Sequence, residues 1–224
     1  DHYAKQAKVV HLEIDPAEIN KNVYADFPVL GNVKETLKIL MELVQPKSHK
    51  EWHNRFKELY KTEYEKVIRG NLDVNKPDLG MAEVIQEINI NTKGNAVIVS
   101  DVGQHQMAAC RYSDFTQTRS NVTSGGLGTM GFALPAAIGA KMGSPKREVV
   151  AIIGDGGYQM TIQELGTIFQ TKVPVKIVVL NNGFLGMVRQ WQQLFFDRRY
   201  ASTEMTNPDF VTIAKGYHIE ANRV

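Results

Sequence analysis

A carboxylate enclosed by glycines follows a run of five apolar residues in the middle of the chain. Val149 to Ile153 are all apolar, and Gly154-Asp155-Gly156 comes directly after them. Glycine lets the backbone approach a ligand closely, and carboxylate oxygens are the atoms that Mg²⁺ and Ca²⁺ prefer. A Gly-Asp-Gly alone is more often a simple turn. Its meaning therefore depends on what lies at the ends of neighbouring strands.

Two further apolar runs end in residues that could serve the same ligand. In open α/β sheets, ligands bind outside the carboxyl ends of the strands. A helix that starts after glycines directs its amide N–H groups at an anion. A divalent cation holding a diphosphate would fit all three strand ends. The other two ends are Val102-Gly103-Gln104-His105, after the run 96–101, and Asn181-Asn182-Gly183, after the run 175–180.

Each of these signals is weak when it stands alone. An Asn-Asn pair after a strand is most often a cap or turn, and the segment SGGLGTMG (124–131) is more often a loop than a site. His105 alone is more often a structural hydrogen-bonding residue than a ligand. The spacing strengthens the case, because the chain between Asp155 and Asn182 is long enough for one helix and one strand. Both oxygen ligands would then lie at adjacent strand ends.

The pattern of elements predicts the fold class that such a site needs. The Val- and Ile-rich runs are continuous rather than alternating, which is typical of strands buried on both faces of a parallel sheet. The predicted class is α/β, a doubly wound and mainly parallel sheet. The helix expected over 130–143 contains Pro135, so a kink is a possibility. Expected elements are helices at 81–90, 130–143 and 161–170, and strands at 96–101, 148–155 and 175–182.

The first third of the chain has a different character. A strand is expected over 8–15, followed by an Asp15-Pro16 helix start and an amphipathic helix over 33–44. The highly charged segment 46–76 predicts a helical linker that lies on a surface. The cluster NLDVNKPDLG marks a boundary near residue 75. We therefore divide the chain at 1–45, 46–76 and 77–224.

Composition excludes several classes of protein. The net charge of +2 argues against a nucleic-acid-binding protein that depends on a strong positive field. Cys110 is the single cysteine, so no internal disulfide can form and a reducing, cytoplasmic setting is expected. No apolar run approaches the roughly 18 residues that cross a bilayer, so no membrane partner is expected.

Longer stretches resemble one enzyme family. Gly-Asp-Gly followed about two dozen residues later by Asn-Asn is similar to the signature of the thiamine-diphosphate-dependent 2-oxoacid decarboxylase superfamily. Within it, SDVGQHQM (100–107), TSGGLGTMGFALPAAIGAKM (123–142) and LNNGFLGMVRQWQQLF (180–195) resemble the catalytic subunits of acetolactate synthases. HLEIDPAEINKN (11–22) and LGNVKETL (30–37) resemble the end of that family's central, Rossmann-like FAD-binding domain.

The resemblance implies a role for individual residues. Asp155, the Asn182 side chain and the Phe184 carbonyl would ligate Mg²⁺, and Trp191 would shape the pocket of the acceptor substrate. Asn32 stands where the family more usually has aspartate. Thiamine diphosphate would contact Val102, Gly103, Gln104, His105, Gly128, Met130, Asp155, Gly156, Gly157, Asn182, Phe184, Leu185, Gly186 and Met187, and FAD would contact Glu13, Ile14, Asn32 and Val33.

The implied activity is the decarboxylation of pyruvate and its condensation with a second 2-oxoacid, either pyruvate or 2-oxobutanoate. It belongs to branched-chain amino-acid synthesis, and FAD would be structural. Implied partners are small 2-oxoacids, a homodimer or homotetramer, and a regulatory small subunit. The family's catalytic glutamate lies in an N-terminal domain that would precede Asp1. The chain also ends before the family's C-terminal tail, so a fragment that is inactive alone is expected.

Two alternatives remain open at this point. One is another enzyme of the superfamily, such as glyoxylate carboligase, pyruvate oxidase or the FAD-independent acetolactate synthase. The stretch Arg189-Gln190-Trp191-Gln192 favours the FAD-associated form. The other alternative is a non-catalytic remnant, against which the intact Asp155 and Asn182 argue.

Overall fold

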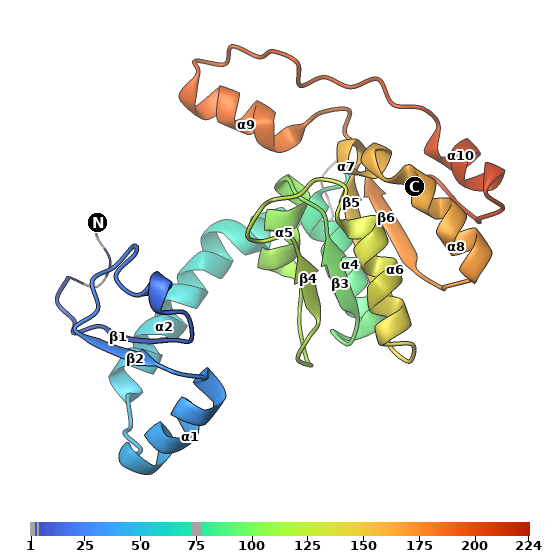
Figure 1. Ribbon diagram of the computed structural model, residues 1–224. Coiled ribbons are helices and arrows are strands. Elements are labelled where there is room, and N and C mark those ends of the chain that lie inside the picture. The colour runs from blue at the N-terminus through green and yellow to red at the C-terminus, as the bar shows by residue number, and fades with distance from the viewer. Residues whose placement is uncertain (1–2, 4, 73–77) are drawn as a thin grey trace. The chain divides into compact units, whose positions relative to one another are not determined.

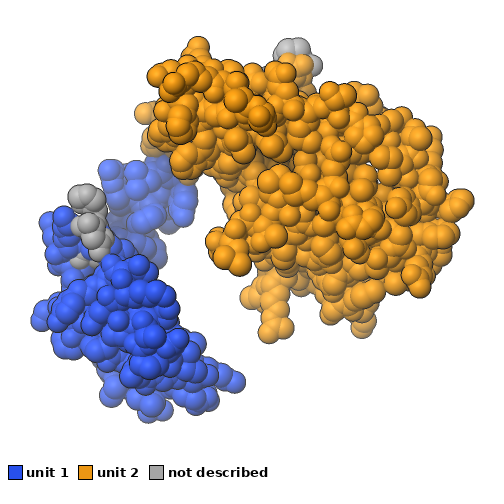
Figure 2. Space-filling model, turned by 45° about the horizontal axis from the view of Figure 1, so that its top comes forward, with its two compact units in different colours: residues 1–60 blue, residues 61–224 orange. Residues whose placement is uncertain are grey.

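The computed structural model describes residues 3, 5–72 and 78–224. It divides into two compact units, Asp1–Tyr60 and Lys61–Val224 (Figure 2). The change of unit falls inside the segment 46–76 that the sequence assigns to a linker. The expected boundary near residue 75 lies outside the described residues, and the division into three segments stays a prediction.

The first unit is a small parallel β-pair with one helix. Strands β1 (Val10–Glu13) and β2 (Phe27–Leu30) pair in parallel, with Glu13 opposite Leu30. The 3₁₀ helix η1 (Pro16–Glu18) begins as expected, because Asp15 accepts a hydrogen bond from the Ala17 amide. Helix α1 (Val33–Leu43) begins after Asn32, whose side chain accepts from the Lys34 amide at 2.9 Å.

The charged segment that follows is helical, as its sequence predicts. Helix α2 (Lys50–Glu63) is continued by the π-helical turn η2 (Tyr64–Ile68) and the short α3 (Arg69–Asn71). The rings of Trp52, Phe56 and Tyr60 form a stripe along α2, with ring centroids 4.3 and 6.3 Å apart. All three side chains are exposed.

The second unit is built around a four-stranded sheet in which every pairing is parallel (Figure 1). The strand order is β4-β3-β5-β6. The sequence analysis places three of these strands correctly but does not include β4. The strands are β3 (Val97–Ser100), β4 (Asn121–Thr123), β5 (Val149–Gly154) and β6 (Lys176–Leu180).

Helices cover both faces of this sheet, which explains the continuous apolar runs. Val149, Ala151 and Ile153 face one cluster, with α6 (Ala133–Gly143) and α8 (Leu165–Thr171). Val150 and Ile152 face the other, with α4 (Met81–Thr92) and α5 (Gln104–Tyr112). The doubly wound α/β class is confirmed.

The remaining helices lie after the strand ends. Helix α7 (Asp155–Met160) starts directly at the end of β5, and the 3₁₀ turn η3 (Ile162–Glu164) leads from it into α8. Helix α9 (Gly186–Phe195) follows β6, and α10 (Phe210–Gly216) comes near the end of the chain.

One local expectation is wrong. The helix expected over 130–143 begins at Ala133, so Pro135 lies in its first turn. The missing N–H of a proline costs little there, because first-turn amides have no partner inside the helix. The possible kink at Pro135 stays a prediction.

Candidate functional site

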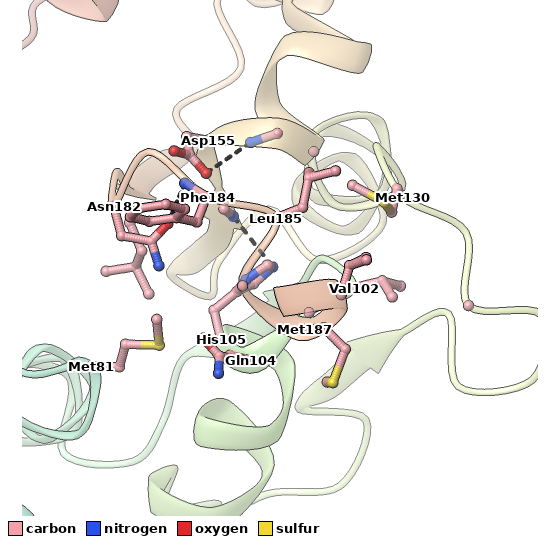
Figure 3. Close-up of a pocket in the computed structure, with 18 residues that line it drawn as sticks. Met81, Val102, Gln104, His105, Met130, Asp155, Asn182, Phe184, Leu185 and Met187 are labelled. Atoms are coloured by element: carbon pink, nitrogen blue, oxygen red, sulfur yellow. Dashed lines mark hydrogen bonds between the residues drawn. The ribbon is translucent and has the colours of Figure 1, made fainter. Parts of the chain in front are cut away.

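A cavity opens at the carboxyl ends of β3, β5 and β6, with about 690 Å³ of empty space, part of it open solvent (Figure 3). It lies where the strand order reverses. From β3 the chain moves outward to β4, whereas from β5 it moves the other way to β6. Such a switch point is the usual place for ligands in open parallel sheets. The cavity is lined by Met81, Val102, Gly103, Gln104, His105, Gly128, Met130, Gly154, Asp155, Gly156, Gly157, Leu180, Asn182, Phe184, Leu185, Gly186, Met187 and Val188.

His105 fits between two glycines. A Cβ atom added to Gly103 or to Gly154 would lie 2.8 Å from the His105 Cε1. The Gly154 amide donates to the His105 Nε2 at 3.2 Å, so this nitrogen carries no proton (Figure 3). Burial lowers the pKa of His105, and the nearby Asp101 and Asp155 only partly oppose this. A neutral imidazole therefore joins the ends of β3 and β5.

Asp155 is 2% exposed, and both of its carboxylate oxygens accept hydrogen bonds. Its Oδ1 accepts from the Gly156 amide at 3.0 Å. Its Oδ2 accepts from the Gly183 amide and from the Asn207 Nδ2, both at 2.7 Å. Every partner is a donor, which suits an ionised carboxylate. The side chain is thereby fixed at the cavity wall.

The segment after β6 supplies the part of the wall next to Asp155, because its Gly183 amide donates to the Asp155 Oδ2. The Asn182 Oδ1 accepts from the Phe184 amide at 3.1 Å. The guanidinium of Arg189 lies between the rings of Phe184 and Tyr200, 4.1 and 4.4 Å from their centroids. Such cation–π contacts hold the Phe184 side chain in place.

Two further contacts fasten this segment. The Leu185 amide donates to the Thr203 carbonyl at 2.8 Å. On α9, Gln190 accepts from the Gln104 Nε2 at 3.0 Å, which joins α9 to the start of α5. The wall after β6 is thereby tied to the chain that follows α9 and to the end of β3.

The loop that carries Gly128 and Met130 is held by a buried carboxylate. Asp101 accepts from the backbone amides of Val102, Gly131 and Ala133 at 2.7 to 3.0 Å. Asp101 is fully buried, and its carboxylate accepts hydrogen bonds from the amides at the start of α6. Gly128 has a φ of +63°, a conformation that glycine adopts without strain. The end of β3 therefore positions this loop.

All fourteen residues that the sequence analysis assigns to thiamine diphosphate line this cavity. Four further residues line it to which no cofactor contact was assigned: Met81, Gly154, Leu180 and Val188. No supporting role was predicted for Asp101, Arg189, Gln190 or Asn207. For Asn207, the turn-like Asn-Pro-Asp at 207–209 is the local signal. The binding roles of the lining residues stay predictions.

Trp191 lies outside the cavity wall. Helix α9 starts at the cavity, which its residues Gly186, Met187 and Val188 line. Further along α9, Trp191 is 56% exposed and contacts Phe195, with ring centroids 5.1 Å apart. Its predicted part in an acceptor pocket stays a prediction.

The four residues assigned to FAD lie together in the first unit, at the ends of its two parallel strands. Glu13 ends β1, and its carboxylate accepts hydrogen bonds from the amides of Ile14 and Asp15. These bonds lower the pKa of Glu13, and the bond from Asp15 has the larger effect. Asn32 caps α1, and Val33 is the first residue of that helix. Their role in FAD binding stays a prediction.

Among the described residues, no group of three or more His, Cys, Asp or Glu side chains could hold a metal ion. The predicted Mg²⁺ ligands are of another kind, one carboxylate with an amide and a carbonyl oxygen. Within the same part of the chain, no helix is long and apolar enough to cross a membrane.

Comparison with known proteins decides the family. Residues 101–224 match the model described as "Thiamine pyrophosphate enzyme, C-terminal TPP binding domain". The chain belongs to the thiamine pyrophosphate enzyme family. The matched residues include β4, β5 and β6, together with the segments after β3, β5 and β6 that line the cavity. The family's ligand, thiamine pyrophosphate, is the thiamine diphosphate that the sequence analysis expects.

Relatives within this thiamine pyrophosphate enzyme family are similar over the full chain. The chain is 42% identical to the acetolactate synthase large subunit of Corynebacterium glutamicum, with 100% of the chain and 37% of the relative covered. It is 41% identical to the acetolactate synthase isozyme 3 large subunit of Escherichia coli, with 96% and 38% covered. It is 40% identical to a probable acetolactate synthase large subunit of Methanocaldococcus jannaschii, with 100% and 39% covered. The chain thus spans less than two fifths of these relatives.

Proposed function

We propose that this chain is part of an acetolactate synthase, and that the cavity at β3, β5 and β6 binds the diphosphate end of thiamine diphosphate through Mg²⁺. The observation that carries the proposal is the convergence of all fourteen assigned residues on one cavity. These residues come from three separate strand ends and one loop, so sequence proximity alone does not bring them together.

The charge of the cavity supports the need for a cation. Its described lining holds one carboxylate, Asp155, and no lysine or arginine. His105 is neutral, because burial lowers its pKa. A diphosphate entering such a cavity would meet a negative charge with no positive side chain to offset it. Mg²⁺ held by hard oxygen atoms resolves this conflict.

The donor set fits that ion. The Asp155 carboxylate, the Asn182 side chain and the Phe184 carbonyl would hold Mg²⁺, and the Met130 side chain lies across the cavity from them (Figure 3). The amides at the start of α5 would bind phosphate oxygens. Thiamine diphosphate, when bound, supplies an electron sink for the decarboxylation of a 2-oxoacid. The residues of this chain hold and orient it.

The remaining parts of the assignment are proposals from the relatives and from the resemblance. The substrates are pyruvate and a second 2-oxoacid, and the product feeds branched-chain amino-acid synthesis. FAD is proposed at Glu13, Ile14, Asn32 and Val33. A homodimer or homotetramer, a regulatory small subunit and a cytoplasmic location complete the proposal.

Replacement of Asp155 tests the proposal directly. In the full-length protein, Asp155→Ala should abolish retention of thiamine diphosphate and Mg²⁺ during gel filtration. The cofactor-free protein should still unfold cooperatively, although at a lower temperature, because two backbone amides lose an acceptor. The exposed Asp78→Ala serves as the matched control and should retain both. Normal cofactor retention by Asp155→Ala would contradict the metal assignment.

The products made from pyruvate test the reaction itself. The full-length protein should form acetolactate with release of CO₂. Acetate with hydrogen peroxide would instead indicate a pyruvate oxidase, and tartronate semialdehyde from glyoxylate would indicate a glyoxylate carboligase. Residues 1–224 alone should form none of these products.

A further inference from the structure

Asn207 uses all of its polar groups on residues next to the cavity. Its Nδ2 donates to the Asp155 Oδ2 at 2.7 Å and to the Asn181 Oδ1 at 2.8 Å. Its Oδ1 accepts from the Gln159 Nε2 at 2.8 Å. Asn207 itself does not line the cavity. It lies shortly before α10, 52 residues after Asp155 in the chain.

The orientation of this carboxamide follows from its partners. An ionised carboxylate only accepts hydrogen bonds, so the amide face toward Asp155 has to be the NH₂ group. The carboxamide oxygen then faces Gln159, whose NH₂ group donates to it. The three contacts are mutually consistent, and a flipped Asn207 would set its oxygen against the Asp155 carboxylate.

The hydrogen bonds of Asp155 leave one oxygen open to a cation. Each carboxylate oxygen offers two lone pairs. On Oδ2, both are engaged, by the Gly183 amide and by Asn207. On Oδ1, only the Gly156 amide is bound. Asn207 therefore completes the arrangement that leaves Oδ1 as the free acceptor.

The same side chain also joins two strand ends. Asp155 follows β5, and Asn181 follows β6 and precedes Asn182, the second proposed metal ligand. One carboxamide in contact with both residues limits how far the two ligands can move apart. Second-layer partners of this kind orient metal ligands, and their loss typically weakens metal binding by about 10- to 100-fold.

We propose that Asn207 is a positioning residue for a divalent cation at Asp155. It holds Oδ2 so that Oδ1 faces the cation, and it keeps the ends of β5 and β6 together. The inference rests on the proposed function, because it takes Asp155 as a ligand of Mg²⁺. It adds a residue that touches neither the cation nor the cofactor, and a second, Gln159, that acts through it.

Titration with Mn²⁺, read by electron paramagnetic resonance, tests the proposal. The full-length protein is titrated at saturating thiamine diphosphate, and the unfolding temperature is measured separately without metal and cofactor. Asn207→Ala should raise the dissociation constant for Mn²⁺ by about 10- to 100-fold. Excess Mn²⁺ should restore cofactor retention. The control Asn91→Ala removes an exposed side chain of α4 that donates hydrogen bonds to Glu87, and should leave the constant unchanged.

A double-mutant cycle with Gln159 separates positioning from general loss of packing. Gln159→Ala should raise the dissociation constant by a smaller factor, because Asn207 keeps its contact with Asp155. In the Asn207→Ala background, Gln159→Ala should have no further effect on Mn²⁺ binding. Gln159→Ala also tests the idea should Asn207→Ala fail to fold.

The outcomes distinguish the inference from the proposed function. An unchanged Mn²⁺ constant in Asn207→Ala, alongside lost binding in Asp155→Ala, would overturn the role of Asn207 and leave the metal site intact. The role of Asn207 would also be overturned if Gln159→Ala raised the Mn²⁺ dissociation constant by the same factor with and without Asn207. Wild-type Mn²⁺ binding by Asp155→Ala would overturn the metal site and this inference together.

Discussion

His105 is the residue in which packing and protonation are most closely linked. Its Nε2 accepts from the Gly154 amide, and its ring fills the space beside two glycines. A proton on Nε2 would remove the acceptor and place a charge in a buried position. The lowered pKa of His105 expresses this cost, with burial as its largest cause.

The stability of the protein should therefore fall with pH below about 6.5, the ordinary pKa of histidine. In that range the unfolded chain binds a proton that the folded chain refuses, so the free energy of unfolding decreases as the pH drops. The slope for one such group is at most about 1.4 kcal/mol per pH unit. Urea unfolding at pH 7.5, 6.5 and 5.5 measures it. His105→Gln should reduce the slope, whereas replacement of the exposed His53 on α2 should not.

Trp191 offers a second test at the level of one residue. Because 56% of its surface is exposed, Trp191→Leu should change the unfolding temperature little. If Trp191 contacts the acceptor in the full-length enzyme, the preference for 2-oxobutanoate over pyruvate should fall by about 10- to 200-fold. Competition between the two acceptors, read as the ratio of the two products, measures this. An unchanged ratio would remove Trp191 from the substrate site.

At the scale of elements, Asp101 links β3 to the start of α6. It accepts three backbone hydrogen bonds while fully buried. Asp101→Ala leaves buried amides without an acceptor and should lower the free energy of unfolding by about 2–4 kcal/mol. Because the loop with Gly128 and Met130 depends on these bonds, affinity for thiamine diphosphate should fall as well. The exposed Asp114→Ala, measured in the same urea series, should show neither effect of this size.

The elements that can be predicted well from the sequence are those with a strong local pattern of apolar residues. β5 and β6 are short runs rich in Val and Ile, and in α4 the residues Met81, Ile85 and Ile88 recur at helical spacing. β4 has three residues, and nothing local separates them from a loop. The supporting residues are harder still, because Asn207 meets Asp155 only after the chain has passed through α7, α8, β6 and α9. The spacing of residues within one segment of the sequence cannot predict a contact between two distant segments.

At the scale of the whole molecule, the two units differ in how much they bury. In residues 1–60 the buried apolar core consists of Ala25 alone among the described residues, and Leu37, Leu40 and Met41 of α1 are exposed. The second unit has two clusters that enclose a sheet on both faces. A small unit with so little buried apolar area does not offset the entropy of ordering its chain.

Expressed separately, residues 1–60 should therefore be unfolded, whereas residues 78–224 should keep helical and strand signals. Circular dichroism and amide-proton dispersion in nuclear magnetic resonance spectra measure the difference. Cooperative unfolding of the isolated residues 1–60 would show that β1, β2 and α1 are stable without further contacts.

The parallel pairing of β3 with β5 also sets the order in which the site can form. Val97 pairs with Val149, which lies 52 positions later in the sequence, after the whole of β4 and α6. Closing such a loop is slow, because the entropy of closure precedes any gain from contacts. β6, which pairs with β5, and Asn207, which contacts Asp155, lie further along the sequence. The proposed cation and cofactor would therefore find no complete binding site until the sheet has assembled. They should leave the refolding rate almost unchanged and act by slowing the unfolding rate.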